Sequence, residues 1–143
     1  MKDVLVYIAE NLQFLWDSNT EENNYKITFS VSSPGSGCII ITSPQLRIQL
    51  TSHHGELTME IEPAFIQRRN GYIPYGAVPI EIIQEAITGV RSGSLKRISG
   101  KHAIFLRDHL GEIVELMSQE NWIEFKASTL QIAKNRADYL REN

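Results

Sequence analysis

Cysteine is almost absent from this chain, because Cys38 is the only one among 143 residues. An intramolecular disulfide is therefore impossible, and the closely spaced Cys and His ligands of a zinc site are missing. Cys38 precedes a run of isoleucines that is typical of a buried strand, so we interpret its thiol as an inert apolar group. A chain without cystine favours a cytoplasmic location.

Long apolar runs and catalytic signatures are missing as well. The apolar run at 4–9 is bracketed by Asp3 and Glu10 and is too short to cross a bilayer, so no membrane partner is expected. No Walker loop, dinucleotide-binding glycine pattern or G-x-S-x-G elbow occurs. We predict no metal site and no cofactor, and a non-catalytic function is favoured over an enzyme.

Charge is unevenly distributed along the chain, whose formal net charge is −3. Residues 1–66 hold eight acids and three bases, whereas residues 67–107 hold seven bases and two acids. Such segmentation affects association with other molecules rather than the fold. The basic segment provides a secondary basic patch formed by Arg91, Lys96, Arg97 and Lys101.

Hydrophobic periodicity predicts an α+β fold. Apolar residues recur at helical spacing in three segments, 3–16, 79–90 and 119–140, and the second of these helices is expected to end near Gly89. Four apolar or alternating runs indicate strands, at 25–31, 38–42, 46–51 and 56–62. Short turns separate these four runs, so we expect an antiparallel meander with one face buried and one face in water. Ile27, Phe29 and Val31 are expected on the buried face.

A C-terminal β-hairpin is expected before the last helix. Apolar-rich runs at 102–107 and 113–117 flank the segment 108–112, which has turn chemistry. The full prediction is one domain over residues 1–143, in the order α-β-β-β-β-α-β-β-α. Its antiparallel meander and hairpin would be packed on one face by about three helices.

The least regular stretch, residues 63–79, is the preferred functional surface. It contains aromatic and arginine residues of the kinds that dominate binding hot spots: Phe65, Arg68, Arg69, Tyr72 and Tyr75. Long irregular connections inside a compact domain often carry function. The alternative is that the aromatic residues of this stretch only cover the open end of the sheet.

Titratable residues give weaker signals. His53 and His54 fall in a predicted turn, where two adjacent side chains are poorly placed to bind one metal ion. Glu60 and Glu62 share one face of a predicted strand. They fit either a carboxylate pair whose repulsion raises one pKa, or the solvated side of a sheet, which we favour.

The favoured function is stoichiometric binding of another protein, acidic on its contacting surface, through the loop at 65–75 and the adjacent basic residues. Toxin-neutralising immunity proteins and secretion chaperones of bacteria share this size, charge and element order. The analogy rests on these general features and on no sequence motif. One alternative is a small enzyme or small-ligand carrier with a pocket between the sheet and the 65–79 loop.

Two further alternatives use other surfaces. A phosphate or nucleic-acid binder would use the basic stretch 91–107. Nucleic acid ranks lowest because the pI is near 5.8 and no aromatic residues for base stacking are interleaved with the cations. A homo-oligomer would assemble through the polar sheet face or a strand edge.

Overall fold

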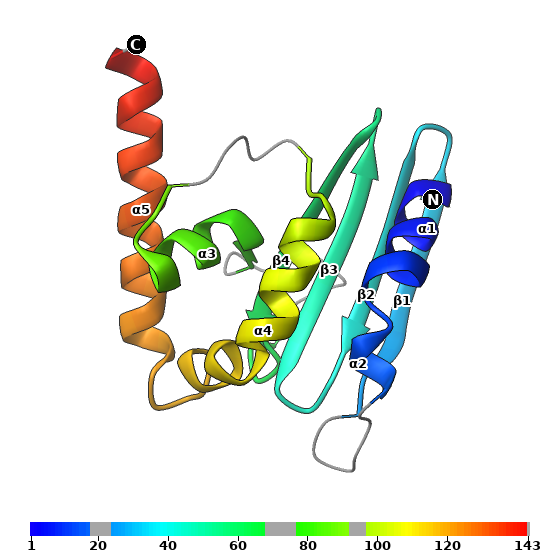
Figure 1. Cartoon of the computed structure of the whole chain (residues 1–143), viewed down its shortest axis with the longest axis horizontal. Helices are drawn as coiled ribbons and strands as arrows, with labels where there is room; N and C mark the ends of the chain where they lie inside the picture. Colours follow the sequence, from blue (N-terminus) through cyan, green and yellow to red (C-terminus); the bar gives the residue numbers. More distant parts are fainter. Residues whose placement is uncertain (18–23, 68–76, 92–96, 143) are drawn as a thin grey trace.

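A five-stranded antiparallel sheet, ordered β1-β2-β3-β4-β5, dominates the computed structural model of the chain (Figure 1). The structure describes residues 1–17, 24–67, 77–91 and 97–142. The strands are β1 (Lys26–Ser33), β2 (Ser36–Thr42), β3 (Leu46–His53), β4 (Glu56–Pro63) and β5 (Val78–Pro79). The helices are α1 (Lys2–Asn11), α2 (Phe14–Asp17), α3 (Ile80–Thr88), α4 (Gly100–Leu116) and α5 (Trp122–Glu142). The predicted α+β class is confirmed.

The first four strands form the predicted meander, because tight turns join them. The turn between β3 and β4 places His54 and Gly55 at φ angles of 47° and 82°, the positive values that a type I′ hairpin requires. The turn between β2 and β3 is closed by Ser43, whose Oγ accepts hydrogen bonds from the backbone N–H groups of Gln45 and Leu46. Local turn chemistry therefore sets the strand order.

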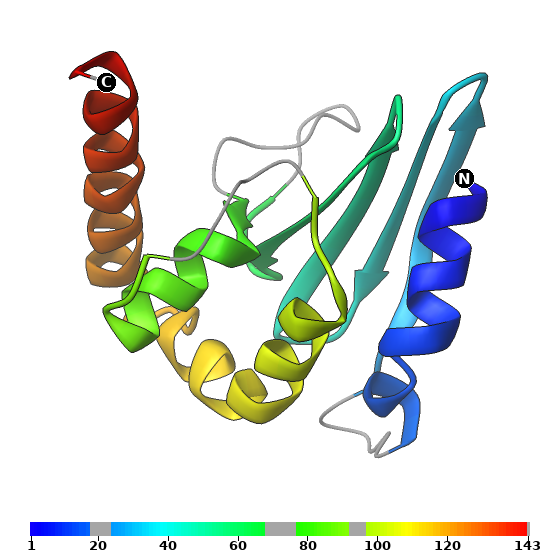
Figure 2. The ribbon, with the colours of Figure 1, turned by 45° about the horizontal axis from the view of Figure 1, so that its top comes forward.

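The described helices lie on one side of the sheet or beyond its β4–β5 margin, as Figures 1 and 2 show from two directions. We call the opposite side the outer face. Ile39, Leu50 and Met59 are cross-strand neighbours on β2, β3 and β4, and all three are buried in the core that includes the helices. Every second residue of these strands consequently points toward the helices.

The expected C-terminal hairpin is wrong, because residues 100–116 form the single helix α4. Ser99 caps its first turn, and the His102 ring accepts a hydrogen bond from the Ser99 backbone N–H over 2.9 Å. Buried or half-buried side chains recur at intervals of three or four residues along α4 and its end, at Ala103, Leu106, Leu110, Ile113 and Met117. Burial of this helical stripe stabilises the helix by more than the turn preference of residues 108–112 destabilises it.

The three predicted helices are present with altered bounds. The helix expected at 3–16 is divided into α1 and α2, and the buried Leu12 lies between them. α3 ends at Gly89, which adopts a left-handed φ of 74°, as the glycine at this position predicted. α5 extends to Glu142 and buries Trp122 and Phe125 against the rest of the core.

The edge strand β1 contradicts the expected burial of its apolar residues. Ile27, Phe29 and Val31 are exposed by 50%, 44% and 50%, although their alternation predicted that they face the helices. All eight residues of β1 are exposed. The apolar side chains of this strand therefore belong to the surface of the protein.

A β-bulge in β1 explains part of this difference. Ile27 pairs with Ile41 on the helix side, whereas Phe29 pairs with Ile40 on the outer face, so Thr28 is an extra residue. Since side chains alternate with a period of two, one extra residue turns the rest of the strand over. Ile27 stays on the helix side, but it lies at the margin of the sheet and remains half exposed.

Candidate functional site

An ion pair on the outer face fixes the start of the predicted binding segment. Arg47 on β3 lies opposite Glu62 on β4, and its Nε donates to Glu62 Oε1 over 2.8 Å. Glu62 is only 1% exposed. The same guanidinium also donates to the backbone carbonyl of Ala64 over 2.8 Å and to that of Ile66. One side chain thus ties the segment that leaves β4 to the sheet.

Phe65 lies between the two carbonyl groups that Arg47 holds, and it is 40% exposed. It is the member of the predicted contact set that the structure describes. The other members, Arg68, Arg69, Tyr72 and Tyr75, lie outside the described residues. The described part of the site is therefore an aromatic ring presented from an anchored backbone.

The secondary basic patch is distributed over separate elements. Arg91 follows α3, Arg97 forms a bridge with Leu57 at the start of β4, and Lys101 is exposed in the first turn of α4. Lys96 lies outside the described residues. Arg97 donates a hydrogen bond to the backbone carbonyl of Gly55, which occupies part of its guanidinium within the fold.

A charge network that joins α3 to α5 engages Arg91 as well. Glu85 Oε1 lies 3.4 Å from Arg91 Nε and 3.2 Å from an Nη of Arg136. The Arg91 guanidinium also lies 5.2 Å from the centre of the Tyr139 ring, a cation–π distance. No sequence pattern indicated this network, in which Arg91 links the end of α3 to α5.

Three glutamates gather where β4 meets the start of α3. Burial, followed by the neighbouring carboxylates of Glu62 and Glu81, raises the pKa of Glu60 above its ordinary value of 4.5. Glu81 is almost fully buried, and its Oε1 has no hydrogen-bond partner within the described structure. The favoured interpretation of Glu60 and Glu62 as the solvated side of a sheet is therefore wrong, because Glu62 is 1% exposed and Glu60 is half-buried. The raised pKa of Glu60 has desolvation as its main cause, and repulsion by the Glu62 carboxylate comes second.

Replacing Glu60 by Gln should stabilise the protein at neutral pH. Because the folded chain holds this proton more tightly than the unfolded chain, the stability from Glu60 is full below pH 4.5 and is lost as the pH rises through the folded pKa. Thermal unfolding of both chains at pH 4 and pH 8 should therefore show a gain in Tm for Glu60→Gln at the higher pH and little difference at the lower. A loss of Tm at both values would contradict this assignment.

The outer face also carries a serine–histidine pair. Ser36 Oγ lies 2.8 Å from His53 Nδ1 beside Cys38, which is half-buried there rather than in the core as expected. These residues border a depression of about 170 Å³ next to Val31. A nucleophile–base pair also needs a third group that orients the histidine, and none is found among the contacts described for His53.

Metal ligands do not converge within the described ranges, where no three His, Cys, Asp or Glu side chains are grouped suitably for an ion. The rings of His53 and His54 are in contact at a tilted angle, with 4.1 Å between their centres. His109 lies in α4, where its Nδ1 is 3.1 Å from Glu112 Oε2. His54 and His109 thus contact neighbours on their own turn or helix, and His53 also contacts Ser36 of β2.

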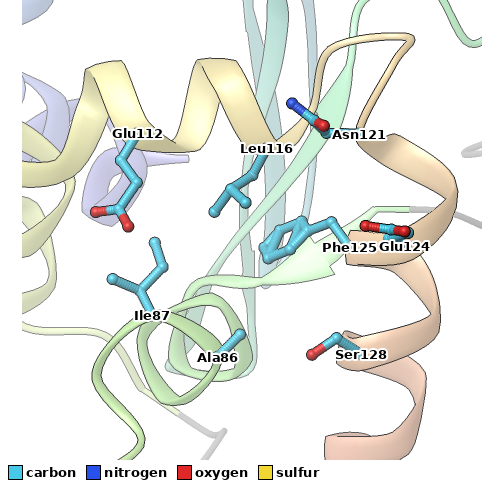
Figure 3. Close-up of a pocket in the computed structure, with 8 residues that line it drawn as sticks. All are labelled: Ala86, Ile87, Glu112, Leu116, Asn121, Glu124, Phe125 and Ser128. Atoms are coloured by element: carbon cyan, nitrogen blue, oxygen red, sulfur yellow. The ribbon is translucent and has the colours of Figure 1, made fainter.

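A pocket of about 310 Å³ lies between α3, α4 and α5 (Figure 3). Its lining is made up of Ala86, Ile87, Glu112, Leu116, Asn121, Glu124, Phe125 and Ser128. Apolar groups form the floor and two carboxylates lie on the rim, so the lining suits a group with an apolar body and a positive charge. The pocket expected between the sheet and the 65–79 loop falls largely on residues outside the described ranges.

No protein-family model, no curated protein and no solved structure matches this chain. Among the helices in the described part of the chain, none combines the length and the apolar character that crossing a bilayer requires. The function must therefore be argued from the residues and their geometry.

Proposed function

We propose that this chain is a non-catalytic protein-binding domain that holds its partner stoichiometrically, with the segment 65–75 as the principal contact. The Arg47 anchor is the observation that carries this proposal. Its guanidinium fixes the backbone on both sides of Phe65, and the buried Glu62 carboxylate fixes the guanidinium. An aromatic side chain held in place before binding loses less conformational entropy when the partner arrives.

The partner in this proposal is acidic on the surface that it presents. Arg68 and Arg69 come three and four positions after Phe65 in the sequence, and Lys101 adds an exposed cation on α4. Opposite charge on a partner would speed association and orient the encounter. Two functions in the bacterial cytoplasm suit a small binding domain of this size and charge. One is neutralisation of a toxin, and the other is protection of a secreted protein. The first requires a folded partner, and the second an unfolded segment.

Replacing Phe65 by Ala should weaken binding of the partner by at least about tenfold, because truncation of a hot-spot aromatic typically costs 1–2 kcal/mol or more. The partner is first captured on the immobilised wild-type chain from the cells that produce it. Its affinity for each variant is then measured by calorimetry with purified components. The wider change Arg68→Ala with Tyr72→Ala should weaken capture further and leave the Tm nearly unchanged.

The matched control is Leu130→Ala, which removes another exposed large apolar side chain, from α5. We expect this variant to bind as the wild type does, and both variants to unfold within about 1 kcal/mol of it, as exposed positions usually do. Equal affinity of the Phe65 variant and the wild type would contradict the proposal. Loss of binding in the Leu130 variant alone would show that the binding site lies on α5.

A further inference from the structure

The two margins of the sheet are treated differently by the fold. At the β4 margin, Val78 of β5 pairs with Ile61, and the backbone N–H of Ile98 donates to the carbonyl of Leu57 over 2.9 Å. At the β1 margin, no described segment pairs with the outward side of the strand. The unpaired N–H and C=O groups along β1 can therefore accept another strand.

β1 carries only a few of the features that usually protect an edge strand. Lys26 is its only charged residue, and it contains no proline. Half-exposed apolar side chains occur on both of its faces, with Ile27 on the helix side and with Phe29 and Val31 on the outer face. The bulge at Thr28 changes which face each side chain occupies, but it leaves the edge itself open.

The apolar surface continues onto the helix above this edge. Tyr7 of α1 points toward α4, because its hydroxyl donates to the carbonyl of Ser99 over 2.7 Å. At about 100° per residue, Leu5 lies on the opposite flank of α1, which is the flank over the β1 side of the sheet (Figure 2). Leu5 is one of the exposed large hydrophobic residues of the chain.

Leu5 is level with the middle of β1. A Cβ atom added to Gly37 would lie 2.6 Å from the backbone of Met1, so the start of α1 lies directly on β2 at this point. Gly37 pairs with Ser32 of β1. Four residues of helix rise about 6 Å, which corresponds to about two residues of a strand, so Leu5 reaches the level of Ser30.

We propose that two copies of this chain form a dimer by antiparallel pairing of β1 with β1, with the two-fold axis at Ser30. In this register Phe29 lies opposite Val31 of the second copy, and the pair occurs twice on the outer face. The two α1 helices become neighbours over the continuous sheet, with Leu5 near the axis in each copy. This inference does not depend on the proposed function, which uses the other end of the sheet.

A second copy fits this edge better than an extended peptide. A peptide strand would cover the sheet layer but would leave Leu5 exposed, whereas a second copy supplies both a strand and a helix layer. Charge repulsion does not oppose the dimer, because the two Lys26 residues would be about 26 Å apart, well beyond the screening length of about 8 Å. The contact between two copies would be a strip about 23 Å long and 20 Å deep. It would bury about 1,000 Å² of surface over both copies, an area typical of a weak dimer.

Charge substitution at the opposed pair tests both the dimer and its register. Sedimentation velocity of the wild-type chain between 5 and 500 µM should show a monomer–dimer equilibrium. Phe29→Glu and Val31→Lys should each weaken it by about tenfold or more, because a charge would face an apolar side chain. An equimolar mixture of the two variants should recover a dimer, since the new carboxylate lies opposite the new ammonium. Leu130→Lys on α5 is the control and should dimerise normally.

A milder substitution covers the case in which a charged variant fails to fold. Opposed residues of an antiparallel pair have Cα atoms about 5 Å apart, within the range of a disulfide. Ser30→Cys should therefore give a covalent dimer on mild oxidation, while Ser32→Cys, whose two copies lie about 13 Å apart, and the wild type should not. A wild-type chain that stays monomeric at 500 µM would overturn the proposal, as would equal cross-linking of the two cysteine variants.

Discussion

Replacing Arg47 by Ala is expected to lower the free energy of unfolding by about 3–5 kcal/mol, the usual effect of removing one partner from a buried ion pair. The loss arises because the Glu62 carboxylate, 1% exposed, is buried and loses the guanidinium that lies 2.8 Å away. The carbonyl groups of Ala64 and Ile66 lose a donor at the same time. Urea unfolding followed by tryptophan fluorescence measures the change.

Two controls distinguish the effect of breaking the buried Arg47–Glu62 pair from the effect of removing any arginine side chain. Arg107→Ala breaks the contact with Asp108 at 3.2 Å, which is exposed on both sides, and should cost less than about 1 kcal/mol. The double change Arg47→Met with Glu62→Leu should recover much of the loss, because apolar residues of similar volume replace both members of the buried pair. A loss below 1 kcal/mol for Arg47→Ala would show that water reaches the Glu62 carboxylate.

Replacing Trp122 by Ala is expected to cost about 3–5 kcal/mol, as loss of a large core aromatic usually does. Trp122 is the first residue of α5 and is 7% exposed, and its ring centre lies 6.4 Å from that of Phe125. These two rings bury the start of a helix whose C-terminal half extends beyond the other elements (Figure 1). Thermal unfolding by circular dichroism at the helix signal measures both the Tm and the helix content.

The neighbouring residue supplies the control for this substitution. Ile123 is 79% exposed, so Ile123→Ala should change the free energy of unfolding by no more than about 0.5 kcal/mol. A similar loss in both variants would mean that the first turn of α5 responds to any change of residue. An intact Tm in the Trp122 variant would contradict the burial of its ring.

Strands and helix ends with strong local signals could be predicted from the sequence. The alternation in β3 and β4, the turn at His54-Gly55 and the end of α3 at Gly89 all follow from properties of residues within a few positions. Each such signal fixes the backbone locally, through positive φ or through the side of the sheet on which an apolar residue lies. These predictions are confirmed for that reason.

The errors arose where two local signals competed. Asp108 and Gly111 indicated a turn, but Ala103, Leu106 and Ile113 form a helical stripe that packs into the core. Burial of several side chains outweighs the cost of about 1 kcal/mol for one glycine inside a helix. The bulge at Thr28 had no comparable sequence signal, because a bulge depends on how two strands pair.

The candidate site could be predicted only in part. The density of Arg and Tyr in residues 65–75 marked the segment, and the structure describes its first aromatic, Phe65, as exposed. The anchor was not predictable, because Arg47 reaches Ile66 across 19 positions of sequence. The network of Glu85 with Arg136 spans 51 positions and depends on how α5 packs on α3.

The sequence by itself determined the α+β class, the meander and the alternating core residues of β3 and β4, because these depend on periodicity and on turns within a few residues. Only the tertiary structure decided which apolar side chains stay outside and which charges meet. Exposure of the apolar side chains and pairing of the charges depend on strand register, on the bulge in β1 and on the packing of the helices. These three features arise from contacts between segments far apart in the chain. The open β1 edge and the Arg47 anchor are consequences of that packing.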